Sequence, residues 1–252
     1  MLWAAALERG ALRGKADQDE RPTTAKTSPQ VGVLTTSRGG LGASGPKRNR
    51  EGTCPLMRTI TSTLSSTKWV SAVDDLEATC WAERRMPGPG GVGWVEPVME
   101  IIEIGAVMAA LPGLELLAEF DSFVRPKLNP TLTDFCRTLT SIRQEDVDGA
   151  PTFPQALAAF AAWTGDPVHV LFASWGEYDK NQLLRDCRLY DVAFPFDGEH
   201  LNIKNHAAGK MGWAPKGVGK TIARLNMSFE GTPHRGLDDA RNILRILRRV
   251  GL

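Results

Sequence analysis

The stretch that decides the fold reads Trp69-Val70-Ser71-Ala72-Val73-Asp74-Asp75-Leu76-Glu77-Ala78-Thr79-Cys80-Trp81. It is an apolar, β-prone run that carries acidic residues, and successive side chains of a strand point to opposite faces. Asp75 and Glu77 therefore share one face, whereas Asp74 shares the other face with Leu76. Two carboxylates on one strand face suit a hard cation, although a bare Asp-x-Glu pattern is more often an exposed strand with solvated acids.

The composition predicts one folded domain with appendages, because 252 residues with 42% hydrophobic and 23% charged side chains can bury a sizeable core. The net charge of +1 is unevenly divided: residues 1–66 hold 10 Lys/Arg against 5 Asp/Glu, and residues 67–252 hold 20 against 24. The acidic globular part gives no bulk support for nucleic-acid binding. A polyanion would have to be held by local cations or by bound metal ions.

Residues 1–66 are predicted to form a disordered, basic, low-complexity segment that precedes a folded domain at 67–252, because they show no sustained period of 2 or 3.6. Their basic residues 47–50 could help to hold nucleic acid, but a solvated tail is favoured. The chain has no apolar run of the roughly 18 residues that a membrane span needs. Its four cysteines, including Cys54, lack a paired spacing, so we expect free thiols, no zinc site and a cytoplasmic location.

Hydrophobic patterns predict the order of the elements. Residues 99–110 and 114–124 read as two strands joined by a turn, which gives three antiparallel strands with the acidic one. A Gly/Pro-rich stretch at 86–94 is predicted to be a loop bordering a site. Further elements are an Ala-rich helix, a buried strand and a second helix, at 154–164, 168–174 and 178–187. The sequence therefore predicts an α/β fold with a sheet covered on both faces.

Two further groups of polar residues follow. Asp179 falls in the first turn of the helix after the buried strand, where open α/β sheets place their sites, although the helix dipole alone would favour an Asp there. On the last helix, a helical wheel places Asp239 at the edge of the apolar stripe and Asp238 toward water. His234 precedes that helix. A lone His there is usually a surface or capping residue, but nearby acids make it a candidate general base.

These residues carry a resemblance to a known family. The segments 75–81, 100–107, 174–179 and 234–242 resemble the three exonuclease motifs of the DEDDh 3′–5′ exonucleases, in the branch of the histone-mRNA 3′ exonuclease. The resemblance covers about residues 68–250, in order. It implies an RNase H-like fold, with a mixed five-stranded sheet flanked by helices, and two divalent metal ions, Mg²⁺ or Mn²⁺.

The resemblance also implies residue roles. The metal-binding acids would be Asp75, Glu77, Asp179 and Asp239, with Glu77 and His234 as catalytic residues and His234 as the base. Substrate contacts would come from Ala78, Thr79, Tyr178 and His234. The implied reaction is hydrolysis from the 3′ end of single-stranded nucleic acid, RNA favoured over DNA, releasing nucleoside 5′-monophosphates. The alternatives are a nuclease-fold binding module without turnover and a DNA-directed proofreading exonuclease.

Two features stand apart from this interpretation. Position 74 is apolar in the relatives considered, so Asp74 is either a local bulge or a third acid near the site. The stretch 216–221 ends like a phosphate-binding loop, but Ala214 replaces the first required Gly and no buried strand precedes it, so nucleoside triphosphate binding is rejected. We expect a helix at 218–225 instead, with phosphate contacts possible from three lysines, Lys210, Lys216 and Lys220.

Overall fold

The computed structural model describes residues 70–83, 86–87 and 94–252 of the chain. The predictions for residues 1–66, which include residues 47–50 and Cys54, lie outside this described part. Within the described ranges, no helix is both long enough and apolar enough to cross a membrane.

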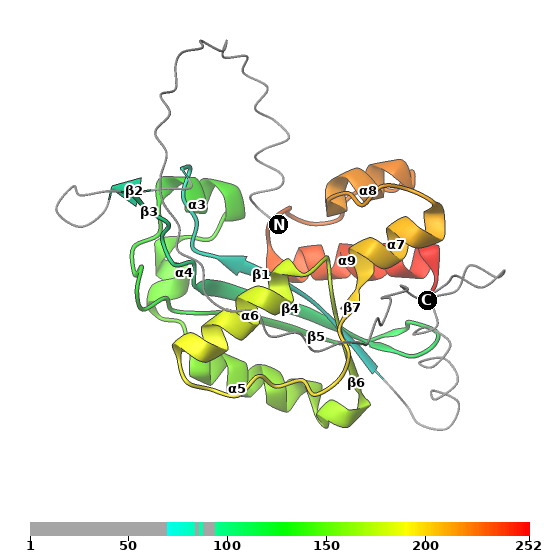
Figure 1. The fold of residues 1–252 in the computed structure, drawn as a ribbon, viewed down its shortest axis with the longest axis horizontal. Coiled ribbons are helices and arrows are strands. Elements are labelled where there is room, and N and C mark those ends of the chain that lie inside the picture. Colours follow the sequence, from blue (N-terminus) through cyan, green and yellow to red (C-terminus); the bar gives the residue numbers. More distant parts are fainter. Residues whose placement is uncertain (1–69, 84–85, 88–93) are drawn as a thin grey trace, which may run out of the picture. The chain divides into compact units, whose positions relative to one another are not determined.

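A mixed five-stranded sheet lies at the centre of the fold, in the order β5-β4-β1-β6-β7 (Figure 1). Its strands are β1 (Val70–Ala78), β4 (Ile101–Ala110), β5 (Leu116–Phe123), β6 (Val170–Ser174) and β7 (Leu201–Asn202). The pairs β1–β4 and β4–β5 are antiparallel, whereas β1–β6 and β6–β7 are parallel. The three antiparallel strands predicted from the sequence are therefore confirmed.

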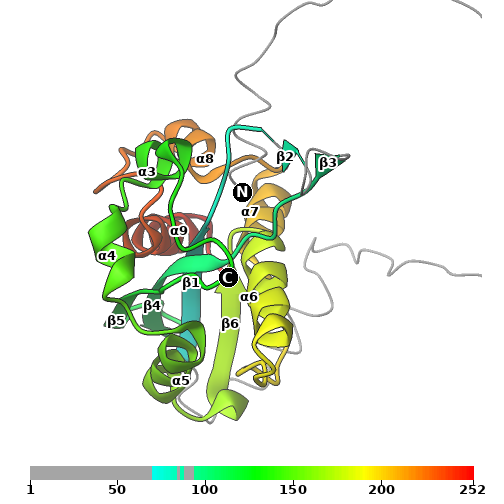
Figure 2. The same ribbon diagram turned by 90° about the vertical axis from the view of Figure 1, so that its left-hand side faces the viewer.

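Helices cover both faces of this sheet (Figure 2). One face packs against α5 (Phe153–Thr164) and α6 (Tyr178–Leu189), and the other packs against α9 (Gly236–Val250). Two shorter helices, α7 (Ile203–Met211) and α8 (Val218–Arg224), pack on α9. The connections contain α3 (Asp134–Thr140), α4 (Gln144–Asp148) and a 3₁₀ turn, η2 (Pro167–His169).

The core between the sheet and the α5/α6 layer follows from strand alternation. Leu76 on β1, Ile104 on β4 and Phe172 on β6 point to this face and are buried against α5 and α6. Phe160 of α5 and Leu183 of α6 complete the same cluster, both with no exposed surface. Because period 2 places residues 74 and 76 here, residues 73, 75 and 77 must face α9.

The structure differs from the sequence predictions mainly in short elements. Two-residue strands, β2 (Met86–Pro87) and β3 (Trp94–Val95), pair antiparallel within the stretch predicted as a loop. The sequence predicted neither β7 nor α7, and α3 and α4 were also missed. A two-residue strand carries no measurable period, and α7 has no clear apolar stripe because its sequence mixes Asn, Gly and Lys with apolar residues.

Candidate active site

The acids of β1 are divided between the two faces of the sheet. Asp75 lies opposite Gly105 of β4, and Glu77 lies opposite Glu103, so both acids face α9. Asp74 faces the other way, opposite Ala106 and Ser174. The prediction from strand alternation, that Asp75 and Glu77 share one face and Asp74 lies on the other, is therefore confirmed. A register shift between Glu77 and the next residue ends the regular pairing at the point where the site begins.

The start of α9 approaches the sheet closely because two glycines meet there. A Cβ added to Gly105 would lie 1.9 Å from the backbone nitrogen of Leu237, and one added to Gly236 would lie 2.9 Å from the backbone oxygen of Asp75. Only glycine permits backbones to approach to this distance. The first turn of α9 therefore lies directly over the acidic strand.

An ion pair between a buried carboxylate and a partly exposed arginine holds the same helix start in place. Glu103 Oε1 accepts hydrogen bonds from Arg235 Nε at 3.0 Å and Nη2 at 2.9 Å, and Glu103 Oε2 accepts from the backbone N–H of Gly236 at 2.9 Å. Glu103 has no exposed surface. Burial raises the pKa of the Glu103 carboxyl, and the bonds from Arg235 and Gly236 oppose that shift. The sequence analysis missed this pair, whose one visible signal was a Glu within an otherwise apolar strand.

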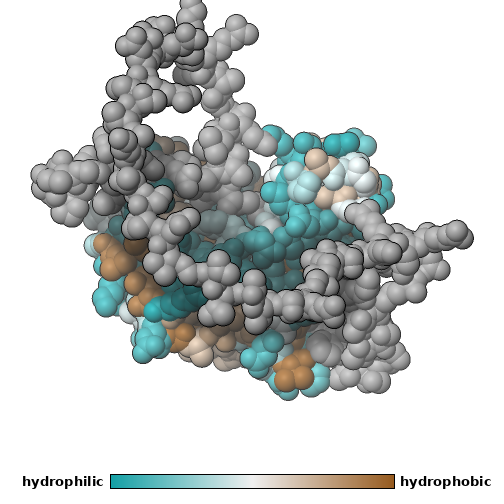
Figure 3. All heavy atoms as spheres, viewed as in Figure 1, coloured by the Kyte–Doolittle hydropathy of each residue, from teal (hydrophilic) through white to brown (hydrophobic). Residues whose placement is uncertain are grey.

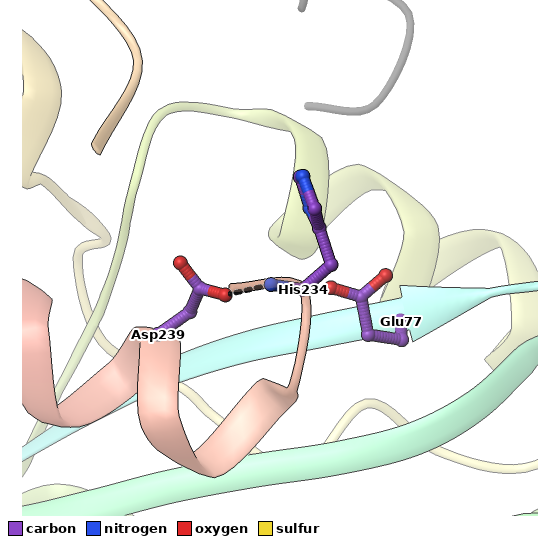
Figure 4. A group of neighbouring side chains, drawn as sticks. All are labelled: Glu77, His234 and Asp239. Atoms are coloured by element: carbon purple, nitrogen blue, oxygen red, sulfur yellow. Dashed lines mark hydrogen bonds between the residues drawn. The ribbon is translucent and has the colours of Figure 1, made fainter. Parts of the chain in front are cut away.

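His234 and Asp239 are brought together by the turn that leads into α9. His234 adopts a left-handed backbone conformation with φ of 63°, and its N–H donates to Asp239 Oδ2 at 2.7 Å. Figure 4 shows this bond, with Glu77 reaching toward it from β1. One ligand atom from each of these three residues lies within 4.8 Å of the other two. The imidazole is therefore within reach of the ligand set, whereas the sequence analysis gave His234 the roles of base and substrate contact and not that of a metal ligand.

Asp179 reaches the site from the first turn of α6. Strand β6 ends at Ser174, so the N–H of Leu76 on β1 has no strand partner on that side and donates to Asp179 Oδ1 at 3.4 Å. Asp179 is 1% exposed, and its Oδ2 has no hydrogen-bond partner among the described residues. Asp75 and Asp179 are not in the 4.8 Å group, so the described residues form one tight trio with two adjoining acids.

The acids share a buried, mutually repulsive environment. Burial raises the pKa of Asp75 well above its usual value, and the charges of Asp179, Asp239 and Glu77 raise it further. Burial likewise raises the pKa of Glu77 and of Asp179, and it raises that of Asp239 to about 7. Buried carboxylates that repel one another need a compensating positive charge.

The donor set fits divalent cations. Glu77 Oε2 and Asp179 Oδ2 are buried without a hydrogen-bond partner in the described part of the chain, which leaves lone pairs available as ligands. Clustered carboxylate oxygens with one imidazole suit Mg²⁺ or Mn²⁺ in chemical type. Three buried cysteines, Cys80, Cys136 and Cys187, are free thiols and do not belong to the group of possible metal ligands.

Asp74 lies on the opposite face of β1 from Asp75 and Glu77. It has no exposed surface, and neither of its carboxylate oxygens has a hydrogen-bond partner among the described residues. Burial raises its pKa well above the usual value, and the charge of Asp179 adds to the shift. Its backbone pairs regularly with β4 and β6, so it is not at a bulge. Asp74 is a buried acid next to the site.

The residues implied as substrate contacts have different surroundings. The Thr79 hydroxyl is buried and accepts from the N–H of Glu100 at 2.9 Å, so it is engaged within the protein. Ala78 is buried at the bulge. Tyr178 is half-buried, with its hydroxyl 3.9 Å from Met99 Sδ, and burial raises its pKa. Ala78 and Thr79 follow Glu77 in the sequence, and Tyr178 precedes Asp179, so their roles as substrate contacts stay predictions.

Asp238 requires a correction. It was predicted to face water, but its side chain is 22% exposed and is engaged on two sides. Asp238 Oδ2 accepts from the N–H of Thr232 at 2.8 Å, and its Oδ1 pairs with Arg241 at 2.9 Å. The wheel placed Asp238 opposite the apolar stripe, but it could not show that the preceding loop folds back over that side of the helix.

Two polar residues behind Asp179 were also missed by the sequence analysis. Ser174 Oγ lies 2.8 Å from His200 Nε2, and the Nδ1 of the same ring lies 3.7 Å from Glu177 Oε2. Ser174 has no exposed surface, and the His200 side chain is 3% exposed. Ser174 and His200 are 26 residues apart, so no local pattern could have connected them.

Several known proteins are similar to this chain. The exonuclease family (RNase_T) matches residues 73–247. Human 3′-5′ exoribonuclease 1 is 35% identical over 186 residues, which cover 70% of this chain and 50% of that protein. ERI1 exoribonuclease 2 of Xenopus laevis is 30% identical over 201 residues, covering 70% of this chain and 27% of the relative. The chain thus spans about half or less of the length of these relatives.

Solved structures agree with these sequence matches. The nuclease domain of 3′hExo, described as a DEDDh family member bound to rAMP, superposes with a TM-score of 0.64 and 32% identity, covering 73% of this chain and 92% of that one. Exonuclease I, at 8% identity and a TM-score of 0.56 over 73% of this chain and 41% of its own, shares the fold alone. The predicted RNase H-like exonuclease fold is therefore confirmed. The match over residues 73–247 makes this chain a member of the exonuclease family, whose DEDDh branch uses divalent metal ions.

Proposed function

We propose that this protein is a metal-dependent 3′–5′ exonuclease that removes nucleoside 5′-monophosphates from the 3′ end of single-stranded RNA. The observation that carries the proposal is the convergence of acids from three elements, β1, α6 and α9, with buried carboxylate oxygens that lack partners within the described chain. Such an arrangement costs stability unless it binds cations. The exoribonuclease names of several relatives favour RNA over DNA.

Asp75, Glu77, Asp179 and Asp239 would hold two divalent ions, Mg²⁺ or Mn²⁺. When bound, such ions would stabilise negative charge on the attacking water oxygen and on the leaving 3′ oxygen of the reaction at phosphorus. The carboxylates orient the ions, and the glycine contact between β4 and α9 fixes the distance between Asp75 and the helix that carries Asp239. The buried surroundings exclude bulk water from this charge arrangement.

His234 would accept the proton of the attacking water. The water oxygen forms a new bond to phosphorus while the bond from phosphorus to the 3′ oxygen of the preceding nucleotide breaks. The products are a nucleoside 5′-monophosphate and a strand shortened by one residue with a free 3′-hydroxyl. The His234 ring extends from a turn whose backbone is held by Asp239, so proton acceptor and acids are positioned by one loop (Figure 4).

Tyr178, Ala78 and Thr79 would border the terminal nucleotide. Tyr178 is half-buried beside Asp179 and offers an aromatic face to a base, whereas Ala78 and Thr79 would contribute through their backbone because the Thr79 hydroxyl already accepts from Glu100 N–H. We place the enzyme in the cytoplasm, since Cys80, Cys136 and Cys187 are free thiols, as expected in a reducing compartment.

Digestion of labelled oligonucleotides tests the proposal. We expect 5′-labelled single-stranded RNA to shorten stepwise in Mg²⁺ or Mn²⁺, 3′-labelled RNA to release labelled mononucleotide at once, and EDTA to stop both reactions. A parallel DNA substrate decides between an exoribonuclease and a proofreading type of enzyme. Binding without turnover in either metal, for the parent chain and the Glu77→Gln variant alike, would instead support a nuclease-fold binding module.

A further inference from the structure

One segment of the domain differs sharply from the rest in charge. Residues 201–229 hold five cations and no Asp or Glu. The remainder of 67–252 holds 15 Lys/Arg against 24 Asp/Glu, a net charge of −9. The cationic side chains are Lys204, Lys210, Lys216, Lys220 and Arg224. An acidic protein that binds a polyanion needs a local region of net positive charge, and this segment supplies one because it holds cations without acids.

The segment is attached to the part of the chain that presents Asp179. The Trp175 indole N–H donates to the backbone oxygen of Lys216 at 3.0 Å. Asn202 Nδ2 donates to Glu177 Oε1 at 2.9 Å, and Lys204 Cδ lies 3.8 Å from the place a Cβ would take on Gly176. Lys204 and Lys216 therefore flank residues 175–177, immediately before the first turn of α6.

Three of these cations, Lys204, Lys216 and Arg224, are available to an anion. No described residue forms an ion pair with Lys204, Lys216 or Arg224. The Arg224 guanidinium lies 4.3 Å from the centre of the Trp213 ring, which orients it without neutralising it. Figure 3 shows hydrophilic residues around the apolar patches of the α7 and α8 region, at the upper right of the view.

Lys210 belongs to the same segment but lies at the other end of α9. Its Nζ donates to the backbone oxygen of Leu252 at 2.7 Å. Helix α9 has 15 residues, which corresponds to about 22 Å, and its start carries the acidic site. Lys210 is therefore distant from the site, although the sequence analysis grouped it with Lys216 and Lys220 as a phosphate contact.

We propose that Lys204 and Lys216, with Arg224 on α8, form a phosphate-binding surface that guides the strand upstream of the 3′ end into the site. The ligand is the backbone of single-stranded nucleic acid, contacted through its phosphates and not through its bases. This inference rests on the proposed function. It predicts a substrate-length effect, because a longer strand offers more upstream phosphates to this surface than a dinucleotide does.

The test compares Lys204→Gln/Lys216→Gln with Lys210→Gln, a matched control on the same segment. Binding of a 5′-labelled 12-mer oligouridylate is measured by fluorescence anisotropy over a range of salt concentrations, in proteins that also carry Glu77→Gln to prevent turnover. We expect the Kd of the double variant at low salt to rise by about fivefold for each lysine replaced. Its slope of log K against log salt should fall by about 0.7 per lost phosphate contact.

The parent-background proteins then show whether the surface serves turnover. The ratio of kcat/KM for the 12-mer to that for the dinucleotide UpU should fall in the double variant, stay unchanged in Lys210→Gln, and recover in Lys204→Arg/Lys216→Arg. If the double variant had the same affinity and the same salt slope as Lys210→Gln, the proposed phosphate-binding surface would be wrong. A parent that binds the 12-mer with the expected slope but degrades neither substrate would overturn the proposed function and leave the surface standing.

Discussion

At the scale of single residues, Asp74 is a buried acid that the surrounding residues do not compensate. Its carboxyl is buried without a hydrogen-bond partner in the described part of the chain, on the apolar face that packs against α5 and α6. Leaving a buried polar group unpaired costs about 1–3 kcal/mol. We expect Asp74→Val to raise the free energy of unfolding by a similar amount, measured by urea denaturation in EDTA at neutral pH.

The Asp74→Asn variant provides the control, because it removes the charge but keeps an unpaired polar group, and it should stabilise less than Val. Nuclease activity of Asp74→Val should persist, since the carboxyl points away from Glu77 and Asp75. A destabilised or inactive Val variant would show instead that Asp74 supports Asp179 in the site.

Replacing His234 should lower turnover while leaving metal binding nearly unchanged. His234→Asn should lower kcat by roughly 10²–10⁴-fold, the usual contribution of a positioned proton acceptor. Asn is the suitable substitution because it tolerates the left-handed conformation at φ of 63° and keeps the N–H that binds Asp239. Single-turnover rates with Mn²⁺ in excess separate this loss from one of metal binding. An unchanged rate would remove His234 from the mechanism.

At the scale of elements, the contact between β4 and α9 sets the geometry of the site. Gly105→Ala would place a Cβ 1.9 Å from the Leu237 backbone nitrogen, so α9 must move outward and carry His234 and Asp239 with it. We expect a loss of stability of about 1–3 kcal/mol or more, with metal-dependent activity lost more completely than the fold. Thermal unfolding and activity assays on the same preparation measure both effects.

Gly149→Ala is the matched control, because no atom lies within 4 Å of the added Cβ and φ is −90°. This variant should keep full activity and change stability by less than about 1 kcal/mol. Equal behaviour of the two alanine variants would show that α9 does not depend on the glycine contact.

At the scale of the whole molecule, the buried acids make stability depend on pH and on metal. Burial raises the pKa of Asp239 to about 7 and that of Asp186 on α6 to about 6, and it raises the pKa values of Asp75 and Glu77. A carboxyl with a raised folded-state pKa binds its proton more tightly in the folded protein. Its stabilising contribution is therefore present below the unfolded pKa, near 4, and is lost as pH rises through about 6–7.

The Tm of the metal-free protein should accordingly decrease as the pH rises from about 5 to about 8. Saturating Mg²⁺ or Mn²⁺ should restore it at pH 8 and have little effect at pH 5, where protonated acids do not bind cations. Differential scanning calorimetry in EDTA and in each metal measures both trends. A Tm in EDTA that rises over this range would contradict the repulsive arrangement of the acids.

Sequence reasoning predicted those parts of the molecule that depend on local periodicity. The pleat assigned Asp75 and Glu77 to one face, and the helical wheel turned Asp239 inward; the structure agrees with both. What it missed depends on contacts that periodicity does not show: Glu103 with Arg235, and the loop that folds over Asp238. Glu103 and Arg235 are 132 positions apart, and the contact of Thr232 with Asp238, six positions apart, depends on how an irregular loop turns back on the helix. The roles of the site residues remain predictions until the variants are measured.

The docking of α9 over the acidic strand has a consequence for the timing of activity. Glu77 is made early, but its partners His234 and Asp239 are separated from it by more than 150 positions of the chain. A ribosome must therefore complete nearly the whole domain before the cluster can exist. Until α9 has folded over β1 and β4, the nascent chain has no complete cluster, and its own messenger RNA, which lies close to it on the ribosome, would not be exposed to the proposed nuclease activity.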